Sequence, residues 1–173
     1  TAVALHLGHR QSIDFDLFTN KPFKTPAIRN RLRGYQQKKV LVSRPGEFTL
    51  ILDGVKCTFF HFPFTIPFSE RFSKMPMADL LTLAAMKAYA LGQRAKWKDY
   101  VDLYFIMREV HTLSDIIQKT TALFGDEFNE KIFRVQLSYY QDVDYSEEVI
   151  FLPGQAVTMT KIKKQLTTWS VQD

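Results

Sequence analysis

Residues 39–62 have the sequence KVLVSRPGEFTLILDGVKCTFFHF, in which apolar runs alternate with two short turns. The turns are Pro45-Gly46 and Asp53-Gly54, and an Asp-Gly pair between apolar runs is the strongest short-range signal for a β-hairpin. We therefore predict a meander of three consecutive strands. Their predicted bounds are Lys39–Ser43, Phe48–Leu52 and Val55–Phe62.

The residues before the meander predict two helices and another strand. Residues 1–8, TAVALHLG, are typical of the end of a helix closed by Gly8. Residues 13–19 alternate as a strand, with the apolar residues 13, 15 and 17 on one face and Asp14 and Asp16 on the other. Thr25-Pro26 predicts a helix that runs to about Gln37, with Thr25 as N-cap and Pro26 at its first position.

The rest of the chain changes character. After a proline-punctuated stretch, residues 62–76, whose aromatic side chains we expect to cover a core edge, helical periodicity dominates. We therefore predict an α+β protein, with a mixed β-sheet lobe over residues 1–75 and a helical lobe over residues 76–173. The predicted helices are residues 78–91, 96–110, 113–124, 127–140 and 157–169.

Length and composition exclude several classes of protein. The chain has 173 residues, of which 46% are hydrophobic, enough to bury a core. Its one cysteine, Cys57, can form neither an intrachain disulfide nor a thiolate zinc site, so we expect a reducing, cytoplasmic setting. No apolar run approaches the roughly 20 residues that a membrane-spanning helix needs, and because no charged-then-apolar segment stands at the start, we expect no leader peptide.

The net charge of +5 is unevenly distributed along the sequence. Residues 21–44 form a basic segment, which would attract phosphates or is a solvated helix face with basic strand ends. Eight cationic residues follow one another with no acid until Glu47: Lys21, Lys24, Arg29, Arg31, Arg33, Lys38, Lys39 and Arg44.

Asp14 and Asp16 are the first candidate site. Alternate residues of a strand point the same way and lie roughly 6.5 to 7 Å apart along it, so two carboxylates can converge on Mg²⁺. Arg10 and Ser12 come just before them, where they could reach a triphosphate that the metal also holds. On an exposed strand the same pair of acids would only be solvated.

Lys87 is the second candidate, because it is the only charge in the apolar run of residues 80–91. Burying an ammonium without a partner is costly, so we expect it to meet Asp99 and Asp102, which share a face of the next helix. Two roles remain open for this group. It is either a structural ion-pair network between two helices, or a site where Lys87 holds phosphate oxygens and Asp99 orients or deprotonates a hydroxyl.

Two stretches resemble a known family. One is Gly8-His9-Arg10-Gln11-Ser12-Ile13-Asp14-Phe15-Asp16, preceded by Thr1 to Leu5. The other runs from Asp79-Leu80 through Lys87 and Arg94 to Lys98-Asp99-Tyr100-Val101-Asp102-Leu103-Tyr104. Together they resemble the AbiEii-type nucleotidyltransferase toxins, relatives of the MenT toxins within the DNA polymerase beta-like nucleotidyltransferase superfamily. The resemblance covers most of residues 1–110.

The resemblance implies transfer of a nucleoside monophosphate from a nucleoside triphosphate to an acceptor hydroxyl, with the 3′ end of tRNA as acceptor. It implies that Asp14 and Asp16 bind Mg²⁺ and that Lys87 and Asp99 are essential. It further implies that residues 1–75 form the nucleotidyltransferase core and that residues 76–173 complete its active-site cleft. The partner implied is a separately encoded antitoxin. The residues implied near the triphosphate are Thr1, Arg10 and Ser12.

The sequence departs from the family pattern in two places. The glycines expected before Thr1 are absent, so we expect an N-terminally clipped core. Residues 55–62 offer Cys57, Thr58 and His61 but no third carboxylate, and Asp53 falls in the hairpin turn. We interpret His61 as a core residue, and His6 and His9 as helix-end residues rather than metal ligands. The alternatives are therefore a catalytically degenerate module that binds nucleic acid or a partner, and a kinase-like phosphoryl transferase.

Overall fold

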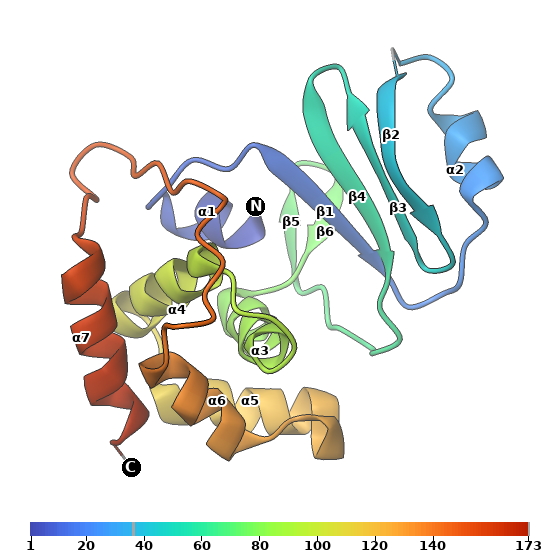
Figure 1. The fold of residues 1–173 in the computed structure, drawn as a ribbon. Coiled ribbons are helices and arrows are strands. Elements are labelled where there is room, and N and C mark those ends of the chain that lie inside the picture. The colour runs from blue at the N-terminus through green and yellow to red at the C-terminus, as the bar shows by residue number, and fades with distance from the viewer. Residues whose placement is uncertain (36, 173) are drawn as a thin grey trace. The chain divides into compact units, whose positions relative to one another are not determined.

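The computed structural model describes residues 1–35 and 37–172, and it has the α+β class that the sequence predicts. The chain forms two compact units. The sheet unit consists of Thr1 and Ser12–Thr65, and the helical unit consists of Ala2–Gln11 and Ile66–Asp173. The helix at the start of the chain, α1 (Ala2–Leu7), thus groups with the later helices and not with the sheet (Figure 1).

The sheet unit is built on the predicted meander, which is confirmed. Four strands lie in the order β1-β4-β3-β2, with β1 parallel to β4 and the other neighbours antiparallel. The turn between β3 and β4 places Asp53 and Gly54 at φ 48° and 85°, in the left-handed region that an Asp-Gly hairpin turn requires. The strands are β1 (Asp14–Thr19), β2 (Gln37–Arg44), β3 (Glu47–Leu52) and β4 (Val55–His61).

Helix α2 (Thr25–Arg31) is shorter than predicted and begins differently. Thr25 is its first residue, and Lys24 occupies the N-cap without a side-chain hydrogen bond, so the prediction of Thr25 as N-cap is wrong. The helix was expected to continue to about Gln37, but β2 already starts there. A turn over residues 32–34, which includes Gly34, ends the helix, and Gln36 within the predicted helix lies outside the described residues.

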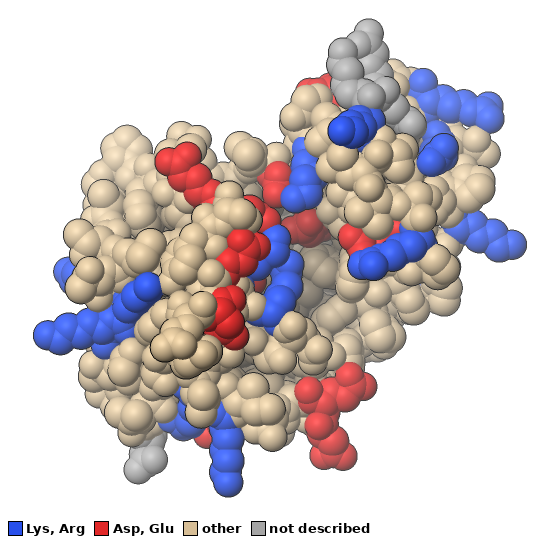
Figure 2. Space-filling model, viewed as in Figure 1, with Lys and Arg blue, Asp and Glu red and all other residues tan. Residues whose placement is uncertain are grey.

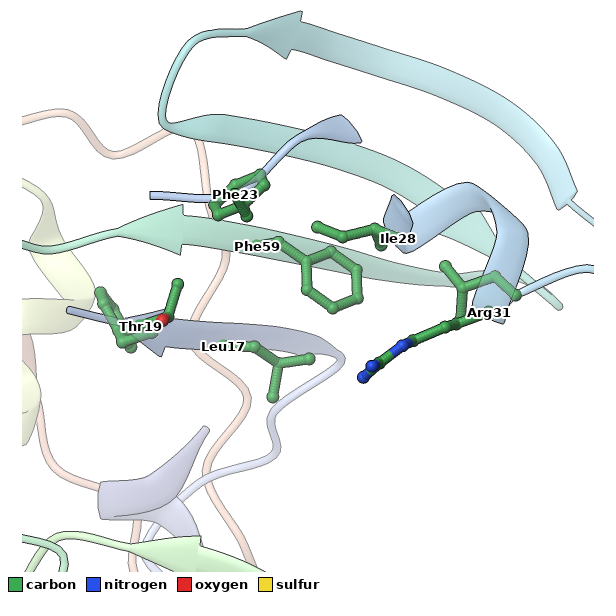
Figure 3. A pocket seen from close by; sticks show the side chains of 8 residues that line it. Leu17, Thr19, Phe23, Ile28, Arg31 and Phe59 are labelled. Atoms are coloured by element: carbon green, nitrogen blue, oxygen red, sulfur yellow. The ribbon is translucent and has the colours of Figure 1, made fainter. Parts of the chain in front are cut away.

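An apolar pocket of about 390 Å³ lies between α2 and the sheet (Figure 3). Leu17 and Phe59 line it from β1 and β4, and Ile28 lines it from α2, while the guanidinium carbon of Arg29 lies 5.4 Å from the ring centre of Phe48. Because Leu17 alternates with Asp16 along β1, this pocket is on the sheet face opposite to the two candidate carboxylates.

The helical unit packs around α4 (Trp97–Glu109), whose residues 99–106 are all buried. Buried Ala84, Ala85 and Ala88 give α3 (Leu80–Leu91) a flat surface for close packing. The other helices are α5 (Leu113–Phe124), α6 (Glu130–Ser138), α7 (Met159–Ser170) and the short 3₁₀ helix η1 (Gly125–Glu127). No helix within the described residues is both long and apolar enough to span a bilayer.

Capping residues explain where these helices begin. The carboxylate of Asp79 accepts a hydrogen bond from the backbone N–H of Thr82 at 2.7 Å and so starts α3. Thr112 and Asp115 form a reciprocal capping box at the start of α5. The five predicted helices are confirmed, with ends that differ by up to three residues from those predicted.

The stretch of residues 62–76 holds a small hairpin that the sequence did not predict. It pairs β5 (Glu70–Phe72) with β6 (Met75–Met77). Phe62 packs edge-on against Phe18 at 5.7 Å, as expected of a residue at a core edge. Phe68 and Phe72 are 52% and 46% exposed, so the expectation that the aromatic residues of this stretch cover a core edge is wrong for these two.

Candidate active site

Asp14 and Asp16 lie on one face of β1, as strand alternation predicts. Their partners across the parallel pairing are Lys56 and Thr58 of β4. The Nζ of Lys56 lies 3.2 Å from Oδ2 of Asp14, an ion pair whose carboxylate side chain is 18% exposed. The face therefore presents two carboxylates at alternate positions, and one of them already attracts a cation.

Thr1 and Ser12 lie beside this pair of acids. Their hydroxyl oxygens are 2.9 Å apart, and the Thr1 hydroxyl also donates a hydrogen bond to the backbone oxygen of Asp14. The structure thus places three sequence-predicted residues, Thr1, Ser12 and Asp14, together at the start of β1. Two hydroxyls next to a carboxylate are an arrangement that can accept both a metal ion and phosphate oxygens.

The negative charges of Asp14 and Asp16 affect a residue of the neighbouring strand, Cys57 of β4. Burial raises the pKa of the Cys57 thiol, and the negative charges of Asp14 and Asp16 raise it further. A site that disfavours a second anion in this way favours a cation. Mg²⁺ is commonly held by one or two carboxylates together with water and substrate phosphates, so the two acids fit this ion.

A third acid does not join them in the described part of the chain. On the next strand of the sheet, β3, the partners of Lys56 and Thr58 are Ile51 and Thr49. The hydroxyls of Thr49 and Thr58 lie 3.3 Å apart. Among the described residues no group of three or more His, Cys, Asp or Glu side chains is arranged to hold a metal ion.

In the helical unit Lys87 meets both acids that the sequence assigned to it. Its Nζ lies 2.5 Å from Oδ1 of Asp99 and 2.8 Å from Oδ2 of Asp102, and Nη2 of Arg94 lies 3.9 Å from the other oxygen of Asp99. Burial alone would lower the pKa of Lys87, but the charges of Asp102 and Asp99 outweigh it and raise that pKa. The ammonium is therefore held in its charged form between α3 and α4.

Asp102 is the centre of this network and is fully buried. Besides Lys87, it accepts hydrogen bonds from Arg10 Nε at 2.6 Å, Arg10 Nη2 at 2.8 Å and His9 Nε2 at 2.9 Å. Burial would raise its pKa, but the Lys87 charge and the hydrogen bonds from His9 and Arg10 hold the pKa of Asp102 well below its ordinary value. All the acceptor positions of this carboxylate have donors.

Residues 9–11 reach Asp102 because their backbone is paired with a segment near the C-terminus. The N–H of Gln11 donates to the oxygen of Ile150 at 2.8 Å, and the N–H of Leu152 donates to the oxygen of His9 at 3.1 Å. The sequence did not predict this pairing. The nearest signal was the mixed apolar and acidic stretch of residues 140–152, which has no helical periodicity.

Arg10 was expected near a triphosphate. In the structure its side chain is 6% exposed, two of its nitrogens donate to Asp102 and the third, Nη1, donates to the backbone oxygen of Gln11 at 3.0 Å. His9, interpreted as a helix-end residue, is fully buried with its ring 4.6 Å from that of Phe105. The expected triphosphate contact of Arg10 stays a prediction.

Asp99 differs from Asp102 because only one of its two carboxylate oxygens accepts a hydrogen bond from the described residues. Oδ1 accepts from Lys87 at 2.5 Å, whereas Oδ2 is buried and has no hydrogen-bond partner among the described residues. A buried carboxylate oxygen without a partner is costly, and such atoms in native structures call for an explanation. A carboxylate of this kind can accept a proton or a hydrogen bond from a bound hydroxyl.

The net positive charge is distributed unequally between the two units. The sheet unit has nine Lys and Arg against four Asp and Glu, and the helical unit has fourteen of each, so the whole excess of +5 belongs to the sheet unit. Figure 2 shows cationic side chains spread over the part of the surface formed by α2 and the edge of the sheet. The exposed cations there are Lys21, Lys24, Arg29, Arg31, Arg33, Lys39 and Arg44.

The sheet unit thus has two carboxylates on one strand, and the helical unit has a half-buried lysine paired with a buried aspartate of the neighbouring helix. The family model described as "Nucleotidyl transferase AbiEii toxin, Type IV TA system" matches residues 56–166 of the chain. The chain belongs to this family. It is also 33% identical over 164 residues to an uncharacterized protein of Aquifex aeolicus, an alignment that covers 83% of this chain and 80% of that protein.

Proposed function

We propose that this protein transfers a nucleoside monophosphate from a nucleoside triphosphate to the hydroxyl of an RNA acceptor, with the 3′ end of tRNA as the acceptor. The observation that supports this most directly is the cluster at the start of β1. Two carboxylates on one strand face, with the hydroxyls of Thr1 and Ser12 beside them, lie in a chain that belongs to a nucleotidyltransferase family.

In the proposed reaction the oxygen of the acceptor hydroxyl forms a bond to the α-phosphorus. The bond between the α-phosphorus and the oxygen that bridges the α- and β-phosphates breaks. Pyrophosphate leaves, and the hydroxyl proton passes to a base. Asp14 and Asp16 would hold Mg²⁺, which neutralises charge on the triphosphate when bound. Thr1 and Ser12 would donate hydrogen bonds to phosphate oxygens.

Lys87 and Asp99 have the remaining roles in the proposal. The charged state of Lys87 suits contact with phosphate oxygens. Oδ2 of Asp99, which accepts no hydrogen bond among the described residues, suits acceptance of the hydroxyl proton. We further propose that residues 1–75 supply the nucleotide-binding core and residues 76–173 the helical part of the same enzyme. Activity would then require residues from both stretches.

The acceptor is proposed as RNA because the sheet unit carries the whole excess positive charge of the chain. A polyanion binds such a surface with an affinity that falls steeply with salt. An acceptor with few phosphates would show no comparable dependence. We also propose that a separately encoded antitoxin counteracts the protein, as the type IV toxin–antitoxin description of the family suggests.

The test is incubation of the full-length protein with each α-labelled nucleoside triphosphate, Mg²⁺ and total tRNA. Label should appear in tRNA with one or more triphosphates, and Asp14→Ala and Asp16→Ala should abolish it. Asp53→Asn is the matched control, because it removes an acid of the same sheet while asparagine tolerates the positive φ of that turn.

Three results would count against the proposal. Transfer of label from the γ- and not the α-phosphate would indicate a kinase-like reaction. Salt-sensitive RNA binding that ignores both Mg²⁺ and the two strand acids would indicate a binding module without catalysis. Label transfer that is unchanged in Asp14→Ala and Asp16→Ala would remove these residues from the mechanism.

A further inference from the structure

The two acids of α4 do not have the same capacity for chemistry. Asp102 has donors on both oxygens, namely Arg10 and His9 on Oδ1 and Arg10 and Lys87 on Oδ2. Asp99 has Lys87 on Oδ1 and no hydrogen-bond partner for Oδ2 among the described residues. A saturated carboxylate has no acceptor left for a substrate, whereas Asp99 has one.

Like the oxygens of Asp102, the side-chain nitrogens of Arg10 are already used in hydrogen bonds within the protein. It uses its Nε and Nη2 for a fork-to-fork pair with Asp102, a geometry that fixes the plane of the carboxylate as well as its position. With its side chain 6% exposed and Nη1 bound to the backbone of Gln11, it has little surface from which to reach a ligand. Its contacts explain the position of Asp102 and do not require a substrate.

We propose that Arg10, with His9, is a positioning residue that acts through Asp102 on Lys87, and that it is not a ligand of the triphosphate. The inference rests on the proposed function for its catalytic consequence. Arg10 fixes Asp102, Asp102 fixes the Lys87 ammonium, and Lys87 occupies only one oxygen of Asp99. The Gly8-His9-Arg10 sequence before β1 thus helps to fix the position of Lys87 on α3.

The first test needs no enzymatic activity. Acylation of lysines by acetic anhydride, read residue by residue by mass spectrometry, measures the unprotonated and accessible fraction of each amine. In Asp102→Asn the acylation rate of Lys87, relative to that of exposed Lys161 on α7, should rise about tenfold for each unit by which the pKa of Lys87 falls. In Arg10→Gln this ratio should not rise, because the variant removes a neighbouring cation and leaves Asp102 paired with Lys87. An unchanged ratio in Asp102→Asn that keeps its native circular dichroism would overturn the proposal.

The second test separates positioning from substrate binding. In Arg10→Gln we expect kcat to fall by about 10- to 100-fold, the effect of a misplaced catalytic group, while KM for the nucleoside triphosphate changes less than about twofold. Arg10→Lys keeps the charge but cannot form the fork, so it should behave like Arg10→Gln. A raised KM with unchanged kcat, restored by Arg10→Lys, would identify Arg10 as a triphosphate ligand and overturn the proposal.

The two experiments fail in different ways. If the wild-type protein transfers no label, the proposed function fails, and the acylation test still decides whether Asp102 holds Lys87. If Asp102→Asn does not fold, the kcat and KM of Arg10→Gln decide the proposal, because this variant leaves Asp102 paired with Lys87.

Discussion

Arg10 and Asp102 are 92 residues apart in the chain and form two parallel hydrogen bonds, 2.6 Å from Nε to Oδ1 and 2.8 Å from Nη2 to Oδ2. The carboxylate is fully buried and also contacts the Lys87 ammonium at 2.8 Å. Asp102 therefore pairs with two cations, whereas Arg10 pairs with this one acid. This asymmetry has a measurable consequence for stability.

We predict that Asp102→Asn destabilises the fold more than Arg10→Met. The first change leaves two partly buried cations facing an amide, and breaking a buried ion pair from one side costs about 3–5 kcal/mol. The second leaves Asp102 paired with Lys87 and should cost about 1–3 kcal/mol, the range for a buried acceptor that loses its donor. Urea unfolding at pH 7 measures both free energies, and equal losses would contradict the argument.

Glu147 gives a prediction about pH. Burial would raise its pKa, but hydrogen bonds from Lys96 and Lys98 lower it from 4.5 to about 2. A depressed pKa stabilises the folded state above pH 4.5, and this contribution is lost as the pH falls toward 2. Glu147→Gln should therefore be less stable than wild type at pH 6 and equally stable near pH 2.

The measurement for Glu147 is the free energy of unfolding as a function of pH. The exposed neighbour Glu148→Gln is the matched control. A stability difference for Glu147→Gln that is the same at pH 6 and at pH 2 would show that the lysine hydrogen bonds are not the cause.

Lys163 of α7 lies among three aromatic rings. Its Nζ is 5.7 Å from the ring centre of Trp97 and 5.0 Å from those of Tyr140 and Tyr145. Lys163→Met keeps most of the apolar side chain and removes the cation, so it should lower stability by about 0.5–2 kcal/mol, the range of cation–π contacts. Exposed Lys161→Met on the same helix should change stability by less than about 0.5 kcal/mol.

Chemical denaturation followed by Trp fluorescence would measure the Lys163 effect. Because the indole of Trp97 contacts the ammonium, its emission should also change in the folded state of Lys163→Met. Equal stability of the Lys163→Met and Lys161→Met proteins would argue that the aromatic rings do not stabilise the cation.

Lys56 should compete with a metal ion for Asp14, since its Nζ lies 3.2 Å from Oδ2 of that residue. The lysine side chain is 37% exposed, and an exposed pair of this kind is worth at most about 1 kcal/mol. We therefore predict that Lys56→Met tightens Mn²⁺ binding by about two- to fivefold. Titration followed by electron paramagnetic resonance measures this, with exposed Lys39→Met as control. Weaker binding in Lys56→Met would instead assign Lys56 to the ligand side.

Sequence patterns were sufficient for most of the secondary structure because local chemistry determines it. The Asp-Gly turn between β3 and β4 and the alternation along β1 hold without reference to the rest of the fold. Helix α2 shows the limit of such reasoning. The helix predicted from Thr25 to about Gln37 ends at Arg31, because a turn over residues 32–34 follows it and β2 begins to pair with β3 at Gln37.

The candidate site divides in the same way. The sequence placed Asp14 beside Asp16 and predicted that Lys87 would need acidic partners, because strand period and the cost of a buried charge are properties of short segments. It assigned Arg10 by resemblance to the triphosphate. Which partner Arg10 meets depends on the pairing of residues 9–11 with residues 150–152, and that contact has no local signature.

The sequence by itself determined the order along the chain of the helices and of the four strands of the main sheet, the face shared by Asp14 and Asp16, and the need of Lys87 for an acid. Tertiary structure alone decided that Asp102 is saturated by His9, Arg10 and Lys87, while Oδ2 of Asp99 accepts no hydrogen bond among the described residues. The physical reason is that packing determines which hydrogen-bond donors reach which acceptor. Four donors from three residues in two separate segments reach the Asp102 carboxylate, and no periodicity in the chain shows which of two acids on a helix they will reach.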